Sequence, residues 1–153
     1  MIIGLISDTH GLLRDSVLRA MRNTSLIIHA GDVGDPRILE ALTNLAPVTA
    51  VRGNVDTAAW ATKLLPTAVV QAGALNIYVL HDVNELKLTA IPSGVSVVVS
   101  GHSHKPGQAM RGGILYINPG SAGPRRFNLP ITVARLDLYR QPWEAEFIDV
   151  SRP

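Results

Sequence analysis

The chain has no cysteine among its 153 residues, which excludes disulfide bridges and thiolate metal sites. Any metal ion would therefore have to be held by nitrogen and oxygen ligands. Aromatic residues make up only 5% of the chain, and the formal net charge is only +2. Nucleic-acid binding usually shows a basic stripe or a recognisable module, and neither is present here. Nucleic acid is therefore not an expected partner.

Long hydrophobic runs are also absent. The longest apolar tract, from Leu64 to Leu80, is interrupted by proline, glycine and amide residues, so we expect no membrane span. No positively charged leader with a cleavage site precedes Asp8, and we expect a cytoplasmic protein. Hydrophobic residues nevertheless make up 46% of the chain, which argues against disorder. The length predicts a single domain over residues 1–153.

The first third of the chain alternates between strand and helix patterns. Three short apolar runs predict buried parallel strands: Ile2–Ser7, Leu26–Ala30 and Val48–Val51. Asp15 is placed to cap a helix over residues 16–23. Asp35 followed by proline predicts a second helix, with apolar residues at helical spacing up to Pro47. We expect a β-α-β-α-β unit whose strand ends converge on one edge of a sheet.

The rest of the chain is richer in strand patterns. The expected strands are Ala68–Gln71, Leu75–Leu80, Val95–Ser100, Gln108–Arg111, Ile114–Asn118, Ile131–Tyr139 and Glu144–Val150. Gly73 and the Gly112-Gly113 pair indicate hairpin turns. A short helix is expected over Leu86–Ala90. Two sheets packed face to face, with helices outside, fit this order.

Polar clusters follow most of the strands in both halves. They are Ser7-Asp8-Thr9-His10, Gly31-Asp32, Gly53-Asn54, His81-Asp82 and Gly101-His102-Ser103-His104. Taken alone, the first is typical of a turn or helix cap, and Asn54 is typical of a turn. Two histidines separated by one residue at the end of a buried strand are rarely there for packing. The five clusters together indicate a site for two cations.

Other polar residues have simpler interpretations. His29 lies inside an apolar strand and is interpreted as a buried, hydrogen-bonded histidine rather than a ligand. Asp35 is interpreted as a helix cap. Four arginines are candidate phosphate contacts, although structural or surface roles are favoured for each: Arg14, Arg52, Arg125 and Arg126.

The five clusters resemble the motifs of the calcineurin-like metallophosphoesterase family, over residues 8 to 104. The segment Asn118-Pro119-Gly120-Ser121 resembles a motif of the small bacterial and archaeal branch of this family, the YfcE-like phosphodiesterases. The resemblance implies an α/β fold, a four-layer αββα sandwich of two mixed β-sheets flanked by helices. It also implies two divalent cations, with Mn²⁺ favoured and Fe, Zn, Ni or Co as alternatives.

The resemblance also implies a ligand set for each cation. The first ion would be held by Asp8, His10, Asp32 and His104. The second would be held by Asp32, Asn54, His81 and His102, so that Asp32 bridges the two. Among these residues, we assign the catalytic roles to Asp32, Asn54 and His102.

These assignments predict a metal-dependent phosphoester hydrolase, with a phosphodiesterase activity on a small phosphoester. Two cations roughly 3.5–4 Å apart lower the pKa of a shared water, and the resulting hydroxide would attack phosphorus in line. Many members of the family carry a histidine directly after Gly-Asn, where it protonates the leaving group, but this chain has Val55. Slow turnover, or a preference for acidic leaving groups, is therefore predicted. Ser103, where threonine is common, is a mild departure. A homodimer is expected by resemblance.

Two alternatives remain open. The retromer scaffold subunit also resembles this fold and is regarded chiefly as a protein-binding platform, so a weakly catalytic or non-catalytic interaction scaffold is the competing function. Such a protein would be expected to have lost ligands, whereas all seven positions are filled here. A metal-dependent nuclease is weakened by the absence of a basic groove and by the short chain.

Overall fold

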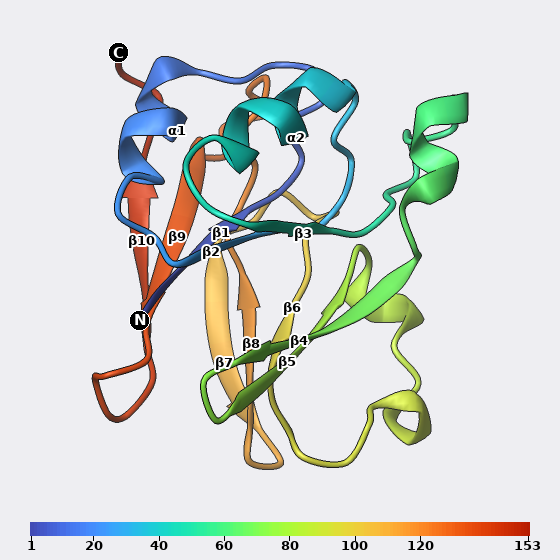
Figure 1. Cartoon of the computed structure of the whole chain (residues 1–153), viewed down its shortest axis with the longest axis vertical. Coiled ribbons are helices and arrows are strands. Elements are labelled where there is room, and N and C mark those ends of the chain that lie inside the picture. Colours follow the sequence, from blue (N-terminus) through green and yellow to red (C-terminus); the bar gives the residue numbers. More distant parts are fainter.

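The computed structural model describes residues 1–153, apart from the side chain of Leu88. Ten strands form two five-stranded sheets. The first sheet has the order β10 (Ala145–Asp149), β9 (Thr132–Asp137), β1 (Ile2–Ile6), β2 (Leu26–His29) and β3 (Val48–Ala50). The second has the order β4 (Thr67–Ala72), β5 (Leu75–Leu80), β6 (Val95–Val99), β8 (Ile114–Asn118) and β7 (Gly107–Arg111). Figure 1 shows how the two sheets are arranged.

Both sheets are mixed, and each has a parallel centre. In the first, β1, β2 and β3 are parallel, while β9 runs antiparallel to both of its neighbours, β1 and β10. In the second, β5, β6 and β8 are parallel, while β4 and β7 form antiparallel edges. Side chains alternate along each strand, so one face of each sheet points into the shared core. Ile3 and Leu5 of the first sheet belong to the same buried cluster as Ile77, Val97 and Val99 of the second.

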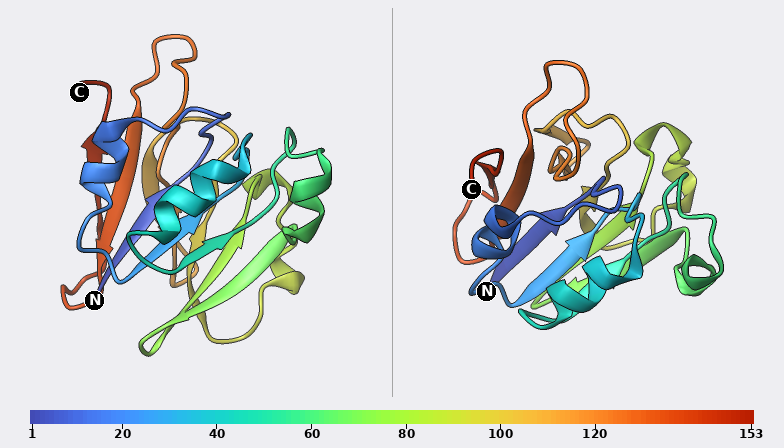
Figure 2. Two further views of the ribbon diagram at one scale, coloured as in Figure 1. Left: turned by 45° about the horizontal axis from the view of Figure 1, so that its top comes forward. Right: turned by 90° about the horizontal axis from the view of Figure 1, so that it is seen from above.

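Two α-helices cover the outer face of the first sheet, α1 (Asp15–Ala20) and α2 (Pro36–Thr43) (Figures 1 and 2). Asp35 caps α2 as predicted, because its Oδ1 accepts the Arg37 N–H at 2.9 Å. The expected cap at Asp15 is wrong, since Asp15 lies in the first turn of α1 and Arg14 occupies the cap position. The helix also stops earlier than predicted, three residues before Asn23, whose φ of 60° lies in the left-handed region.

The outer face of the second sheet is covered by short 3₁₀ helices, η2 (Val83–Glu85) and η3 (Leu88–Ala90). They replace the single helix expected over Leu86–Ala90, because Leu86 itself has an extended backbone and packs onto the sheet. A third 3₁₀ helix, η1 (Ala59–Lys63), was not predicted. The four-layer sandwich is confirmed, with its fourth layer reduced to these turns. None of the helices in the described part of the chain is long and apolar enough to cross a membrane.

The parallel strands of both sheets end at one common edge. The loop after β1 is tied to the loop after β2, since Asp8 N donates to Gly31 O at 3.0 Å. The loop after β6 is tied to the end of β5 in the same way, since Gly101 N donates to His81 O at 2.9 Å. Asp8 Oδ2 also accepts the His102 N–H at 3.1 Å, which joins the two sheets at this edge. The convergence expected from the first three strands therefore extends to the second sheet.

Candidate metal centre

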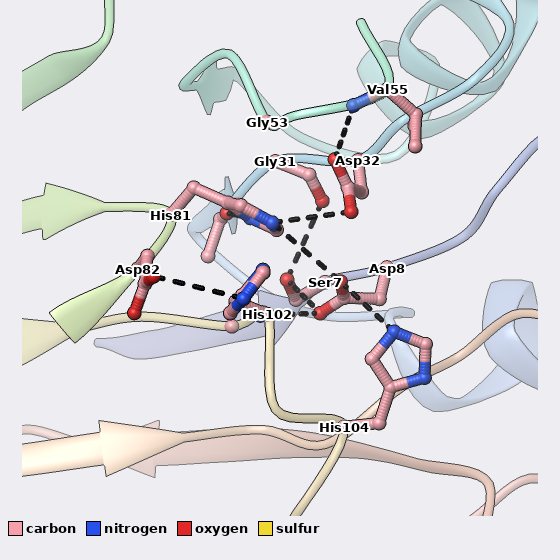
Figure 3. A network of polar contacts seen from close by, with 12 residues as sticks. Ser7, Asp8, Gly31, Asp32, Gly53, Val55, His81, Asp82, His102 and His104 are labelled. Atoms are coloured by element: carbon pink, nitrogen blue, oxygen red, sulfur yellow. Dashed lines mark hydrogen bonds and ion pairs between the residues drawn. The ribbon is translucent and has the colours of Figure 1, made fainter. Parts of the chain in front are cut away.

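The candidate ligands meet at the edge where the parallel strands end. Two groups of three residues each bring one ligand atom per residue to within 4.8 Å of the others. The first group is Asp8, His10 and His104, and the second is Asp32, His81 and His102. Figure 3 shows the labelled members of both groups turned toward a shared space. Each group contains three of the four residues that the resemblance assigned to one ion.

One carboxylate oxygen lies at the centre of the first group. Asp8 Oδ1 is 3.3 Å from His104 Nε2 and 3.7 Å from His10 Nε2. The two histidine Nε2 atoms are themselves 3.4 Å apart. Asp8 is fully buried and His104 is 3% exposed, so these two side chains have almost no access to bulk water.

Asp32 lies between the two groups. Its Oδ2 is 3.2 Å from His81 Nε2 in the second group and 3.6 Å from His10 Nε2 in the first. Its Oδ1 accepts the backbone N–H of Val55 at 3.0 Å, which brings the Gly53-Asn54 turn against the carboxylate. Asn54 lines a pocket together with His81. One oxygen of Asp32 therefore lies near a histidine of each group.

The hydrogen bonds of the site leave ligand atoms without partners. Asp8 Oδ2 accepts from Ser7 Oγ at 2.7 Å, but Asp8 Oδ1 is buried and has no hydrogen-bond partner in the described chain. His81 Nδ1 donates to Ala30 O at 2.7 Å, which leaves Nε2 as the lone-pair atom of the neutral ring. That Nε2 is also buried without a hydrogen-bond partner. Unpartnered acceptors facing one another fit a cation, because each would otherwise cost free energy.

The charged groups of the site shift one another's pKa values. Burial raises the pKa of Asp8, but its contacts with His10, His104 and Ser7 outweigh burial and hold the pKa below its ordinary value. Burial lowers the pKa of His81, but Asp32 and the Ala30 carbonyl raise it overall to about 8. The pKa of Asp32 is lowered despite burial, chiefly through His81 and the Val55 N–H. The negative charge that raises the pKa of His81 is the charge that a cation at this site would meet.

Backbone strain is concentrated in the candidate ligands. Five of them have φ between 47° and 69°, in the left-handed region: Asp8, His10, Asp32, His102 and His104. Among the described non-glycine residues, only two others share this conformation, Asn23 and Phe127. Each left-handed residue costs on the order of 1 kcal/mol, and such strain is characteristic of functional sites.

Two glycines permit the loops to approach this closely. A Cβ at Gly53 would collide with the backbone nitrogen and the Oδ1 of Asp32. A Cβ at Gly101 would collide with Ser7 Oγ and would lie 2.6 Å from Asp8 Oδ2. Because the glycines of the Gly-Asn and Gly-His motifs have no Cβ, the neighbouring carboxylates can lie directly against the backbone at these positions.

His29 has the structural role predicted for it. The Gly31 N–H donates to His29 Nδ1 at 3.2 Å, which places the ring proton on Nε2. His29 Nε2 lies 3.0 Å from Thr9 Oγ1, and Thr9 Oγ1 donates onward to Val33 O at 2.8 Å. Every polar side-chain atom in this series of hydrogen bonds has a partner, and the series connects the loop after β1 to the loop after β2.

The supporting roles of several residues were not predicted from the sequence. Asp56 is 3% exposed and accepts three backbone N–H groups, from Val33, Gly34 and Gly53. Asn118 Nδ2 donates to Gly101 O at 2.9 Å, and Ser121 Oγ donates to Asp8 O at 3.0 Å. The spacing Gly-Asn-x-Asp was a usable signal for Asp56, whereas the contacts made by Asn118 and Ser121 depend on tertiary structure.

Three of the four candidate phosphate contacts separate into two kinds. Arg14 donates to Gly123 O at 3.2 Å and Arg125 donates to Leu129 O at 3.4 Å, so both have structural partners. Arg52 instead lines the pocket that contains Asn54 and His81. Asp82, from the predicted His81-Asp82 cluster, accepts the Asn84 N–H at the start of η2 and lies 3.6 Å from His102 Nε2.

Comparison with known proteins identifies the family to which this chain belongs. Residues 1–141 match the family model described as the calcineurin-like phosphoesterase superfamily domain. The chain belongs to this superfamily. A relative named as a probable metallophosphoesterase, from Methanothermobacter thermautotrophicus, is 33% identical over 165 residues, covering 100% of this chain and 95% of that protein. This metallophosphoesterase family acts on phosphoesters and uses divalent metals.

Solved structures share the fold of this metallophosphoesterase. The phosphoesterase YfcE from E. coli has a TM-score of 0.70 and 27% identity, covering 90% of this chain and 89% of that one. A structure described as a novel archaeal phosphodiesterase has a TM-score of 0.79 at 23% identity, covering 97% and 100%. Vps29 from Entamoeba histolytica, solved with zinc, has a TM-score of 0.71 at 21% identity, covering 99% and 100%. The last two likenesses are evidence for the fold alone.

Proposed function

We propose that this chain is a dinuclear metal-dependent phosphodiesterase that hydrolyses the P–O bond of a small phosphoester. The observation that carries the proposal is the pair of ligand groups joined by Asp32, whose Oδ2 lies within 3.6 Å of a histidine Nε2 in each group. The seven ligands would be Asp8, His10, Asp32, Asn54, His81, His102 and His104. When bound, divalent cations lower the pKa of a water and offset charge on the phosphoryl oxygens.

The protein groups contribute orientation and exclusion of water. The Ala30 carbonyl fixes the His81 tautomer, so that Nε2 faces the carboxylates before any ion binds. The Ser7 hydroxyl and the His102 N–H hold one oxygen of Asp8 and leave the other oriented toward the histidines. Such preorganisation lowers the cost of reaching a productive geometry.

No side chain at position 55 can protonate the leaving group. The backbone N–H of Val55 holds Asp32, while its side chain is 47% exposed. An alkoxide leaving group would therefore depart without help from this position, and leaving groups of low pKa would be favoured. We keep slow turnover and a preference for acidic leaving groups as parts of the proposal.

The scaffold alternative receives less support from this chain. The likeness to Vps29 is below 25% identity and concerns the fold. Six of the seven proposed ligands fall into the two metal-ligating groups, with Asn54 beside them in the pocket wall. A scaffold has no need to maintain five strained backbones around unpartnered acceptors. Hydrolysis is therefore the function that we propose.

The test is hydrolysis of a chromogenic phosphodiester and a chromogenic phosphomonoester by metal-stripped protein, with and without added Mn²⁺. We expect turnover only with metal, and faster turnover of the diester. Absence of metal-dependent turnover on both substrates would refute the enzymatic proposal.

Asp32→Ala and Asp35→Ala form a matched pair for the same assay. Asp32→Ala removes the proposed bridge and should abolish turnover. Asp35→Ala removes a carboxylate only three residues away that caps α2 and binds Arg37, and it should leave turnover intact. Retained activity in Asp32→Ala would overturn the assignment of the site.

A further inference from the structure

A pocket opens beside the candidate metal centre, on the outer face of the second sheet. It has a volume of about 300 Å³ and shares Asn54 and His81 with the metal centre. Its far wall is formed by Tyr78 and Leu80 of β5, and its rim by the segment that carries η2 and η3. Because the pocket and the metal centre share these residues, one ester group of a phosphoester held at the metal centre would have access to the pocket.

Tyr78 supplies a polar atom that no residue of the described chain uses. The residue is 8% exposed, and it packs in a cluster with Leu80 on the outer face of the sheet. Its hydroxyl makes no hydrogen bond within the described residues, although the side chain lines the pocket. The hydroxyl is not one of the buried atoms that lack a partner, so it is open to water in the pocket. An acceptor atom of a ligand in the pocket would take the place of that water.

The rest of the lining is mainly apolar near Tyr78. Pro66, Leu80, Leu86 and Ala90 all face the pocket. Such walls favour a flat or compact apolar group, with a polar atom to match a single convergent hydroxyl. They offer little to a strongly hydrated substituent such as a sugar chain.

The charged residues around the pocket balance one another. Arg52 and Lys87 are matched by Asp82 and Glu85, so the four formal charges sum to zero. A site that demanded a second phosphate would show an excess of positive charge. The charges therefore favour a neutral substituent on the ester.

We infer that this pocket binds one ester substituent of the substrate, and that the substrate class is phosphoesters carrying a neutral, ring-sized group with a hydrogen-bond acceptor for Tyr78. The inference rests on the proposed function, because the phosphoryl group must be held at the metal centre. Tyr78 acts here as a specificity residue, since it contacts the substituent and not the phosphorus.

Binding of phosphonates to the Mn²⁺-loaded protein tests the pocket without requiring turnover. Isothermal titration calorimetry would compare methylphosphonate, phenylphosphonate and 4-nitrophenylphosphonate. Burial of the ring should make phenylphosphonate bind about tenfold more tightly than methylphosphonate. Equal affinities of these two probes would overturn the inference and leave the proposed function standing. Failure of all three to bind would overturn both.

Two substitutions assign the effect to this pocket. Ala90→Trp, at an exposed rim position, should remove the advantage of the phenyl group and leave methylphosphonate affinity unchanged. Tyr78→Phe should weaken 4-nitrophenylphosphonate about three- to tenfold, the range expected for one hydrogen bond, and leave phenylphosphonate unchanged. Tyr139→Phe, the same change at a residue that is 84% exposed and outside this pocket, is the control. A phenyl advantage that survives in Ala90→Trp would overturn the inference.

Discussion

His29 and His81 are both buried histidines, one at the end of β2 and the other just after β5, yet their rings are in opposite situations. Burial lowers the pKa of His29 to about 4, and both of its nitrogens have hydrogen-bond partners. Contacts with Asp32 and the Ala30 carbonyl outweigh burial at His81 and raise its pKa to about 8, and its Nε2 has no hydrogen-bond partner. Both rings are buried, so the feature that distinguishes the candidate ligand from the structural histidine is its unpartnered nitrogen.

The largest expected effect comes from shortening His81. Asparagine can keep the hydrogen bond to Ala30 O, but it has no atom at the position of Nε2. If His81 is a ligand, His81→Asn should lower metal-dependent kcat/KM at least on the order of 10³-fold, as removal of central catalytic residues does. Steady-state kinetics with Mn²⁺ would measure the loss. A decrease smaller than tenfold would place His81 in the same class as His29.

Acid should destabilise the protein through His29. The unfolded chain protonates this residue below about pH 6.5, whereas the folded chain does so only near pH 4. Stability is therefore complete above the unfolded pKa and falls as the pH decreases toward 4, by about 3 kcal/mol for this group. Urea unfolding of the metal-free protein between pH 7 and 4 would show the trend. Its absence from the difference between wild type and His29→Asn would contradict the prediction.

His29→Asn should have a smaller effect, on stability and not on metal binding. The substitution can keep the acceptor for the Gly31 N–H but breaks the link to Thr9, leaving a buried hydroxyl with one partner fewer. We expect a loss of about 1–3 kcal/mol in the free energy of unfolding at pH 7. Mn²⁺ affinity, measured by calorimetry, should stay within about threefold. A large loss of Mn²⁺ affinity would make His29 part of the metal centre.

The smallest effect is expected at Asp82. Its carboxylate lies 3.6 Å from His102 Nε2, and His102 is the most exposed of the candidate ligands in the two groups. Asp82→Asn removes the charge and should weaken Mn²⁺ binding about tenfold, at the low end for residues that support a ligand. Glu85→Gln, a like change in the same pocket wall, is a control that should leave Mn²⁺ binding unchanged.

Much of the centre was predictable because strand ends are a local signal. The apolar runs that become β1, β2, β5 and β6 each end just before a candidate ligand or its glycine, and parallel strands bring such ends together. His29 could be distinguished from the candidate ligands because it lies within a predicted strand. Asp35 could be distinguished from them because a proline follows it, as is typical of a helix cap.

The remaining features depend on contacts between distant segments. The three N–H groups on Asp56 come from two different loops, and the Tyr78 hydroxyl acquires meaning only from the pocket beside it. Asp15 matched the pattern of a cap, but the chain enters α1 one residue earlier. The outer layer of the second sheet was overestimated, because Leu86 is used to cover the sheet and interrupts the helical pattern.

The left-handed backbones of the ligands have a consequence for how this protein can change over generations. Because each strained candidate ligand costs stability, replacing one with glycine would relieve strain at that position while removing a proposed ion contact. In the metal-free protein such replacements would favour folding, and selection for activity would oppose them. A lineage released from that selection could retain the fold, lose the candidate ligands and use this edge of the sheets for another function.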